Sequence, residues 1–187
     1  GKDQEQHLEM TRTFALRFNR MYKVDYFPEP QAFNFGKNLV KIPGLNGNGK
    51  MGKSEGEGNA IYLADSPDEI RKKVMKAKTD SGPTEPNQKK PEEIENLFHL
   101  MRAVSKPETV QYFDDLYNSC QIRYGDMKKQ LAEDMIQFVA PFSEKIKAYV
   151  SDKDYLDKVA KLGADKARES AQKTIRDVRE IIGFKAY

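Results

Sequence analysis

The sequence predicts a chain of the α/β plus α class, a short α/β segment followed by a mostly helical bundle. Three observations support this prediction. Residues 38–42 carry Val and Ile and lead directly into a glycine-rich loop, as a buried strand before a ligand site does. From Pro91 onward, apolar residues recur at helical spacings without strand signals. Residues 79–91 between these parts are rich in Pro, Gly, Asn and Lys and are predicted to be a loop or linker.

Composition excludes several classes of protein. The chain has 187 residues, 38% of them hydrophobic and 33% charged, and a net charge of +3 is too small to indicate nucleic-acid binding by itself. Its single cysteine, Cys120, excludes an internal disulfide and a multi-cysteine metal site. No apolar run approaches the roughly 20 residues that span a bilayer. We therefore expect a cytoplasmic protein without a membrane partner, and the abrupt start at Gly1 predicts a piece of a longer polypeptide.

The first predicted element is an amphipathic helix over residues 4–22. Asp3, with Gln6 three residues later, resembles a capping box at its start. His7 is interpreted as a residue of the helix face, because no partner for acid–base chemistry lies beside it in the sequence. Apolar or small residues recur along one stripe at Leu8, Thr11, Ala15, Phe18 and Tyr22.

The next elements are predicted to be extended. Pro28 and Pro30 mark a loop, Phe33–Phe35 is a candidate short strand, and Asn38–Ile42 is a candidate buried parallel strand. Six of the chain's 12 glycines follow within Ile42–Gly58. A strand that runs into such a loop is a usual place for a nucleotide site in an open α/β sheet.

The loop itself permits three interpretations. Lys50 and Lys53 could neutralise a polyphosphate, since a mobile loop lets compact lysine charges follow the ligand. Residues Gly47–Ser54 also fit the P-loop pattern G-x-x-x-x-G-K-[ST], which predicts a phosphate cradle of another kind. A solvent-exposed linker with ordinary lysines is the third interpretation. The loop alone leaves all three open.

The remainder is predicted to be helical. Ser66–Glu69 provides a capping serine, a proline at the first helical position and an acidic third residue. The basic residues that follow form a solvated face or, alternatively, an RNA-facing patch. Cys120 is expected to be buried, Pro141 to kink its helix, and helices to end at Gly163 and Gly183. One apolar stripe of this helical part is expected at Leu131, Met135, Phe138, Phe142, Ile146 and Tyr149.

A resemblance to a known family distinguishes between the interpretations of the loop. Lys50-Met51-Gly52-Lys53-Ser54 resembles the KMSKS signature of class I aminoacyl-tRNA synthetases, with glycine in place of the first serine. Residues 1–12 resemble the segment G-x-D-Q-x-x-H-x-x-x-T-R of the tryptophanyl-tRNA synthetase family. Short segments at 41–45, 79–83 and 96–98 recur in that family's order, so the resemblance covers essentially the whole chain.

The resemblance implies a fold and an activity. Residues 1–64 would be the C-terminal part of a Rossmann catalytic domain, residues 65–163 a helical anticodon-binding domain, and residues 164–187 a helix that packs back on the catalytic part. The parent protein would be a homodimeric ligase of translation that uses ATP and Mg²⁺ to join tryptophan to tRNA(Trp). The first half of its active site would precede Gly1, so this segment alone is expected to be inactive.

The resemblance also implies roles for individual residues. Lys50 and Lys53 would be catalytic by neutralising the departing pyrophosphate, Gln4 would face the bound tryptophan, and no protein residue would bind a metal. The departure at Gly52 removes a hydroxyl and adds flexibility, with a modest expected effect on loop closure. The implied ATP-binding residues are Gly1, Lys2, Asp3, Ile42, Lys50, Met51, Gly52, Lys53 and Ser54.

Two alternatives remain. The tyrosyl-tRNA synthetase family shares fold and chemistry, although Gln6-His7 and Thr11-Arg12 argue against it. A non-catalytic P-loop-like module that binds a nucleotide or RNA would need a Walker B aspartate after an apolar strand. Only Ile61–Asp65 offers one, and it follows the loop too closely for the intervening helix.

Overall fold

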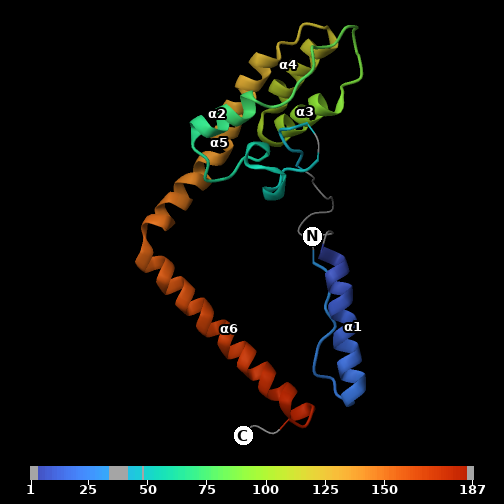
Figure 1. The fold of residues 1–187 in the computed structure, drawn as a ribbon, viewed down its shortest axis with the longest axis vertical. Coiled ribbons are helices and arrows are strands. Elements are labelled where there is room, and N and C mark those ends of the chain that lie inside the picture. Colours follow the sequence, from blue (N-terminus) through green and yellow to red (C-terminus); the bar gives the residue numbers. More distant parts are fainter. Residues whose placement is uncertain (1–3, 34–41, 48, 185–187) are drawn as a thin grey trace. The chain divides into compact units, whose positions relative to one another are not determined.

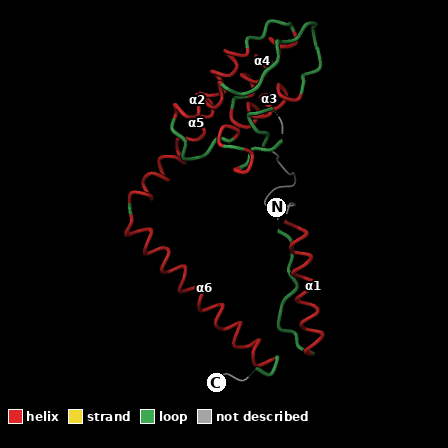
Figure 2. The backbone as a smooth tube through the Cα atoms, in the orientation of Figure 1, coloured by secondary structure: helices red, strands yellow, loops and turns green. Residues whose placement is uncertain are grey.

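The computed structural model describes residues 4–33, 42–47 and 49–184, and the described part is helix and loop (Figures 1 and 2). It divides into two compact units, one formed by residues 1–40 with 154–187 and the other by residues 41–153. The predicted helical part is confirmed. No β-strand occurs in the described ranges, only an isolated antiparallel bridge between Pro43 and Lys50. The Rossmann segment is therefore not seen, and the candidate strand 38–42 lies outside the described residues except for Ile42.

The first unit contains helix α1, Glu5–Tyr22, which confirms the prediction of a helix over 4–22 to within one residue. The helix ends at Lys23, whose left-handed φ of 54° turns the chain back. The Asn19 side chain then holds the returning segment: Oδ1 accepts from the N–H groups of Tyr26 (3.2 Å) and Phe27 (3.1 Å), and Nδ2 donates to the Phe27 carbonyl (2.8 Å). The Tyr26 hydroxyl donates to Asp177 on helix α6 at 3.2 Å, which joins this segment to α6.

Helix α6, Lys153–Ile181, runs without a break through Gly163. The expectation that a helix ends at Gly163 is wrong. Gly163 does not have the left-handed backbone of a terminal glycine, and no other part of the chain lies near its missing side chain. The prediction for Gly183 is confirmed: its φ is 77°, and Phe184 N–H donates to the Arg179 carbonyl at 2.7 Å.

The second unit packs four helices around one apolar core. They are α2 (Pro67–Met75), α3 (Glu92–Val104), α4 (Pro107–Asn118) and α5 (Tyr124–Ser151). The capping box predicted before α2 is confirmed, because Ser66 Oγ accepts from Glu69 N–H and the Glu69 carboxylate accepts from Ser66 N–H. Buried residues of the core include Leu45, Ile70, Val74, Ile94, Phe98, Met101, Tyr117, Met127 and Leu131.

Two details of the predicted packing are wrong. Phe138 and Phe142 are 48% and 45% exposed, whereas Val139 of the same helix is buried. Leu131 and Met135 are buried as predicted, but the later part of the buried stripe of α5 runs through Val139 and Ser143 instead of Phe138 and Phe142, because it follows the surface offered by α2 and α3. Cys120 is exposed, with a φ of 58°, because it forms the left-handed turn that ends α4. A residue in such a turn leaves the apolar stripe of its helix.

Candidate functional site: the glycine-rich loop

The glycine-rich loop folds back on itself in the second unit. Met51 N–H donates to the Ile42 carbonyl at 2.8 Å, and the bridge between Pro43 and Lys50 sets the two arms antiparallel. The turn between the arms uses left-handed backbone at Gly47 (φ 85°) and Gly49 (φ 74°), which glycine adopts at little steric cost. Two of the loop's glycines are therefore explained by this turn.

The signature-like segment, Lys50–Ser54, begins on the second arm at Lys50. Lys50 is exposed, and Gly52 is extended, with φ −156° and ψ 156°. Lys53–Glu55 forms the 3₁₀ helix η2, and Ser54 within it is exposed. Of the two lysines expected to meet a polyphosphate, Lys50 is thus available to a ligand.

Two of the implied ATP-binding residues, Ile42 and Met51, lie on opposite arms of the loop. Ile42 is 38% exposed, as a ligand contact requires. Met51 is half-buried and packs against the helical core, and its contact with ATP stays a prediction.

The loop is fixed to the helical core by contacts that the sequence analysis did not predict. Leu45 is 2% exposed in the core, and its carbonyl accepts from Lys78 N–H at 3.2 Å. Asn96 on α3 donates through Nδ2 to the Gly47 carbonyl at 3.0 Å. Leu45 and Asn96 both belong to short segments that the sequence analysis singled out, but their partners Lys78 and Gly47 could not be inferred from the sequence.

Asn59 is a second residue that the sequence analysis missed. It is 1% exposed and ends the 3₁₀ helix η3, Glu57–Asn59. Its Oδ1 accepts from Asn46 N–H at 2.8 Å, and its Nδ2 donates to the Lys50 carbonyl at 3.3 Å. The only signal in the sequence was a polar residue directly before the apolar pair Ala60-Ile61.

The geometry argues against the P-loop interpretation. A P-loop cradles phosphate at the start of an α-helix that opens with its Lys-Ser pair. Here η2 and η3 follow Lys53, and the next α-helix, α2, begins only at Pro67. Among the described residues, the loop therefore lacks the helix N-terminus that a P-loop requires.

The other predicted site residues belong to the first unit. Gly1, Lys2 and Asp3 lie outside the described residues, and Gln4 is the exposed N-cap residue of α1. The structure describes this unit separately from the loop, so the role of Gln4 in facing bound tryptophan stays a prediction.

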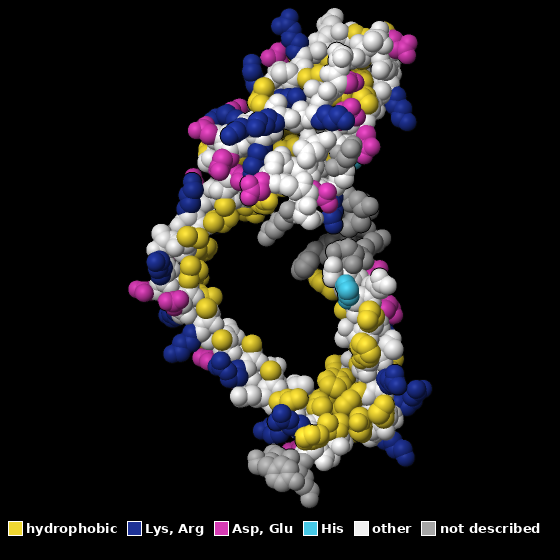
Figure 3. Space-filling model, in the orientation of Figure 1, with side chains coloured by type: hydrophobic (Ala, Val, Ile, Leu, Met, Phe, Trp, Pro, Cys, Tyr) yellow, Lys and Arg dark blue, Asp and Glu magenta, His cyan; other side chains and the backbone are white. Residues whose placement is uncertain are grey.

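The basic residues of α2 do not form one free patch. Arg71 pairs with Glu133 on α5 at 2.7 Å and with Asp68. Lys73 pairs with Asp65 at 2.6 Å and lies 4.7 Å from the centre of the Tyr62 ring. On the face drawn in Figure 3, Lys and Arg side chains are likewise scattered among acidic ones. Arg71 fits the solvated-face interpretation, whereas Lys73 is only 17% exposed and has a structural contact.

Two titratable groups beside residues 79–91, the buried Lys128 and the half-buried Tyr124, have structural roles. Lys128 on α5 is 8% exposed and donates to the Ala77 carbonyl at 2.6 Å and to Thr79 Oγ1 at 3.2 Å. Burial lowers the pKa of its ammonium group. Burial also raises the pKa of the Tyr124 phenol, with the negative charge of Asp80 as a further cause. These contacts tie α5 to the segment after α2.

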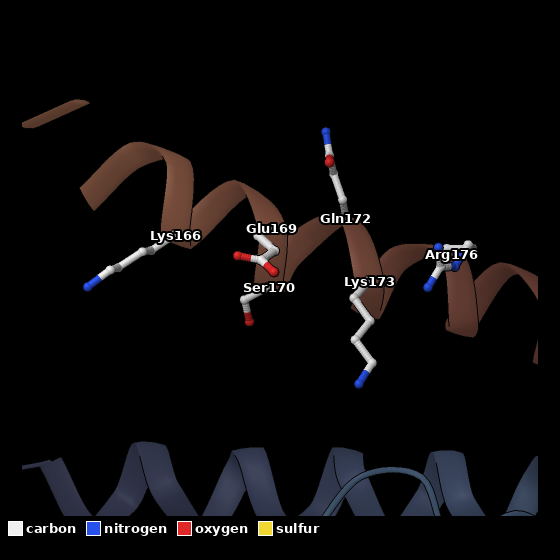
Figure 4. A pocket seen from close by; sticks show the side chains of 6 residues that line it. All are labelled: Lys166, Glu169, Ser170, Gln172, Lys173 and Arg176. Atoms are coloured by element: carbon white, nitrogen blue, oxygen red, sulfur yellow. The ribbon is translucent and has the colours of Figure 1, made fainter. Parts of the chain in front are cut away.

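Other surfaces offer weaker candidates. A groove of about 550 Å³ is lined by six residues that all come from α6, with mixed charge (Figure 4). Its residues are Lys166, Glu169, Ser170, Gln172, Lys173 and Arg176.

Among the described residues, no group of three or more His, Cys, Asp or Glu side chains is placed to hold a metal ion. No helix of the described ranges is long and apolar enough to cross a membrane.

Comparison with known proteins identifies the class to which this loop and fold belong. Residues 1–140 match the sequence model of a family described as tRNA synthetases class I (W and Y). The chain therefore belongs to the class I tRNA synthetases of this family.

Within the family, the chain is similar in sequence to tryptophan–tRNA ligases. The chain is 58% identical to the tryptophan–tRNA ligase of Porphyromonas gingivalis over 185 residues, 99% of this chain and 56% of that protein. It is 39% identical to the tryptophan–tRNA ligase of Helicobacter pylori, over 98% of this chain and 55% of the relative. The chain thus spans about half the length of the curated relatives it matches.

Solved structures agree with this relationship. The tryptophanyl-tRNA synthetase of Campylobacter jejuni, complexed with ADP and tryptophan, is similar with a TM-score of 0.76 at 27% identity, over 98% of this chain and 55% of that one. The tyrosyl-tRNA synthetase of Aeropyrum pernix is similar with a TM-score of 0.52 at 21% identity, over 86% of this chain and 46% of that one, and shows a shared fold alone.

Proposed function

We propose that this chain is the C-terminal portion of a tryptophan–tRNA ligase. The tryptophan carboxylate would attack the α-phosphorus of ATP, and the bond from that phosphorus to the pyrophosphate oxygen would break, giving tryptophanyl-adenylate and pyrophosphate. The acyl group would then pass to the 3′ end of tRNA(Trp), releasing AMP. The observation that carries the proposal is the exposed Lys50 in a signature-like loop, within a chain 58% identical to a ligase of this kind.

The role of the loop is electrostatic. Charge develops on the leaving pyrophosphate, and cations placed beside it lower the barrier more than they strengthen ground-state binding. Lys50 and Lys53 supply that charge in the proposed mechanism, and Gly52 and Ser54 keep the backbone between and after them open to the phosphates. Mg²⁺ would be bound by the phosphates of ATP. The loop is assigned no metal ligand, and its lysines would contact the same phosphates.

The finer architecture belongs to the same proposal. Residues 1–64 would complete a Rossmann catalytic domain, residues 65–163 would read the anticodon, and residues 164–187 would pack on the catalytic part. Gly1, Lys2, Asp3, Ile42 and Met51 would contact ATP, and Gln4 would contact tryptophan. The parent protein would act as a cytoplasmic homodimer. This segment alone would form no adenylate.

Lys53 provides a direct test of the mechanism. In the parent enzyme, Lys53→Ala should lower the rate of adenylate formation by roughly 100-fold, as the loss of one preorganised transition-state contact does, while ATP affinity changes far less. Single-turnover kinetics separate the two quantities. Equal losses in rate and in affinity would contradict a role specific to the transition state.

The function is tested by ATP–pyrophosphate exchange with tryptophan and tyrosine offered separately. Exchange that depends on tryptophan, by the parent protein and not by this segment, is the expected result. Exchange with tyrosine alone would transfer the assignment to the tyrosyl family. No exchange by the parent with either amino acid would overturn the proposal, and turnover by the segment alone would overturn the part that divides the active site.

A further inference from the structure

We propose that Asn59 is a positioning residue for Lys50, the first lysine of the signature-like segment. The inference rests on the proposed function, in which Lys50 acts on the leaving pyrophosphate. Asn59 does not face solvent and so does not itself touch a ligand, being 1% exposed. It would act by fixing the backbone from which the Lys50 side chain projects.

The contacts of Asn59 reach both arms of the loop. On the first arm, its Oδ1 accepts from Asn46 N–H at 2.8 Å and its own carbonyl accepts from Leu45 N–H at 3.1 Å. On the second arm, its Nδ2 donates to the Lys50 carbonyl at 3.3 Å. One buried side chain therefore sets the separation of the two arms at the point where Lys50 leaves the loop.

The chemistry of these contacts requires an amide. Asn46 offers a donor and Lys50 an acceptor, so the central group must accept on one atom and donate on another, as asparagine does. The same partners fix which end of the amide is oxygen. Aspartate would meet the Lys50 carbonyl with a second acceptor, and serine would be too short to reach both arms.

Gly44 provides independent support, because it leaves room for this amide. A Cβ placed on Gly44 would lie 2.3 Å from both Asn59 Oδ1 and Nδ2, far closer than side-chain atoms can approach. Gly44 does not have a left-handed φ, so its backbone alone would accept alanine. The glycine is therefore explained by the volume of the Asn59 side chain. A substitution at either position should disturb the same contact.

The test uses the full-length parent enzyme and its tryptophan-dependent ATP–pyrophosphate exchange. Asn59→Ala and Gly44→Ala should each lower kcat by roughly 10- to 100-fold, the loss expected when a catalytic group is held out of place, with a smaller change in the KM for ATP. The double variant should lose no more than either single variant, because both remove the same contact. Gly58→Ala is the matched control, since nothing lies within 4 Å of its added methyl group.

A second cycle separates positioning from general loosening. In a Lys50→Ala background, Asn59→Ala should cause no further loss of kcat, because its effect passes through Lys50. A full loss in that background, or wild-type kcat for Asn59→Ala alone, would overturn the proposal. Circular dichroism of each variant serves as the control that its helices remain intact.

Trypsin cleavage after Lys50 provides a readout that does not depend on activity. Asn59→Ala and Gly44→Ala should speed this cleavage by roughly tenfold or more, because cleavage follows the population of the opened loop. Gly58→Ala should not. Unchanged cleavage would overturn the positioning role even in a parent that exchanges with tryptophan. Faster cleavage in a parent without exchange would support loop positioning and refute the ligase assignment.

Discussion

Lys90 joins residues 79–91 to the helical core, and its removal should measurably destabilise the second unit. Its Nζ lies 2.7 Å from Asp114 Oδ1, 4.8 Å from the centre of the Phe98 ring and 4.6 Å from the centre of the Tyr117 ring. Both aromatic side chains are fully buried, and the Lys90 side chain is 13% exposed. The charge is therefore poorly screened by solvent, which strengthens all three contacts.

The magnitude follows from these contacts. Each partly desolvated cation–π contact contributes about 1 kcal/mol, and the ion pair contributes about as much. Because the contacts share one ammonium group and are not additive, Lys90→Ala should lower the free energy of unfolding by about 2–3 kcal/mol. Lys90→Met keeps most of the apolar stem and should lose about 2 kcal/mol.

Urea unfolding followed by circular dichroism measures these differences. Lys89→Ala is the matched control, since Lys89 is exposed and a substitution there should change stability by less than about 0.5 kcal/mol. In an Asp114→Asn background, Lys90→Met should still cost about 1 kcal/mol or more, because the aromatic contacts remain. If Lys90→Ala matched the Lys89→Ala control, the reasoning about desolvated cation–π contacts would be refuted.

Two further changes test local features of the helices. The hydrogen bonds from Ser66 lower the pKa of Glu69. Glu69 therefore stabilises the chain above the ordinary glutamate pKa of about 4.3, and this contribution disappears as the pH falls through the lower folded-state value. Glu69→Gln should flatten the loss of stability in acid, measured by urea unfolding from pH 7 to 3, and an unchanged profile would contradict the capping box. Gly163→Ala should stabilise α6 by about 0.5–1 kcal/mol, because Gly163 lies inside the helix beside open space; a lower melting temperature would indicate a terminal glycine instead.

The sequence determined the features that depend on neighbouring residues. The start of α2 at Ser66, the extent of α1 and the terminal glycine Gly183 were predicted correctly, because capping and helix propensity act within a few residues. The position of the loop signature at Lys50–Ser54 was likewise a local pattern, and the comparisons support the family to which it points.

Only the tertiary structure decided how those local features are held. Asn59 reaches Asn46, and Asn96 reaches Gly47, across separations that no periodicity encodes. The buried stripe of α5 likewise differed from the prediction at Phe138, because the surface that a helix buries depends on the partners that meet it. Sequence patterns record the chemistry of each residue, whereas burial and hydrogen-bond partners arise only when distant segments pack together.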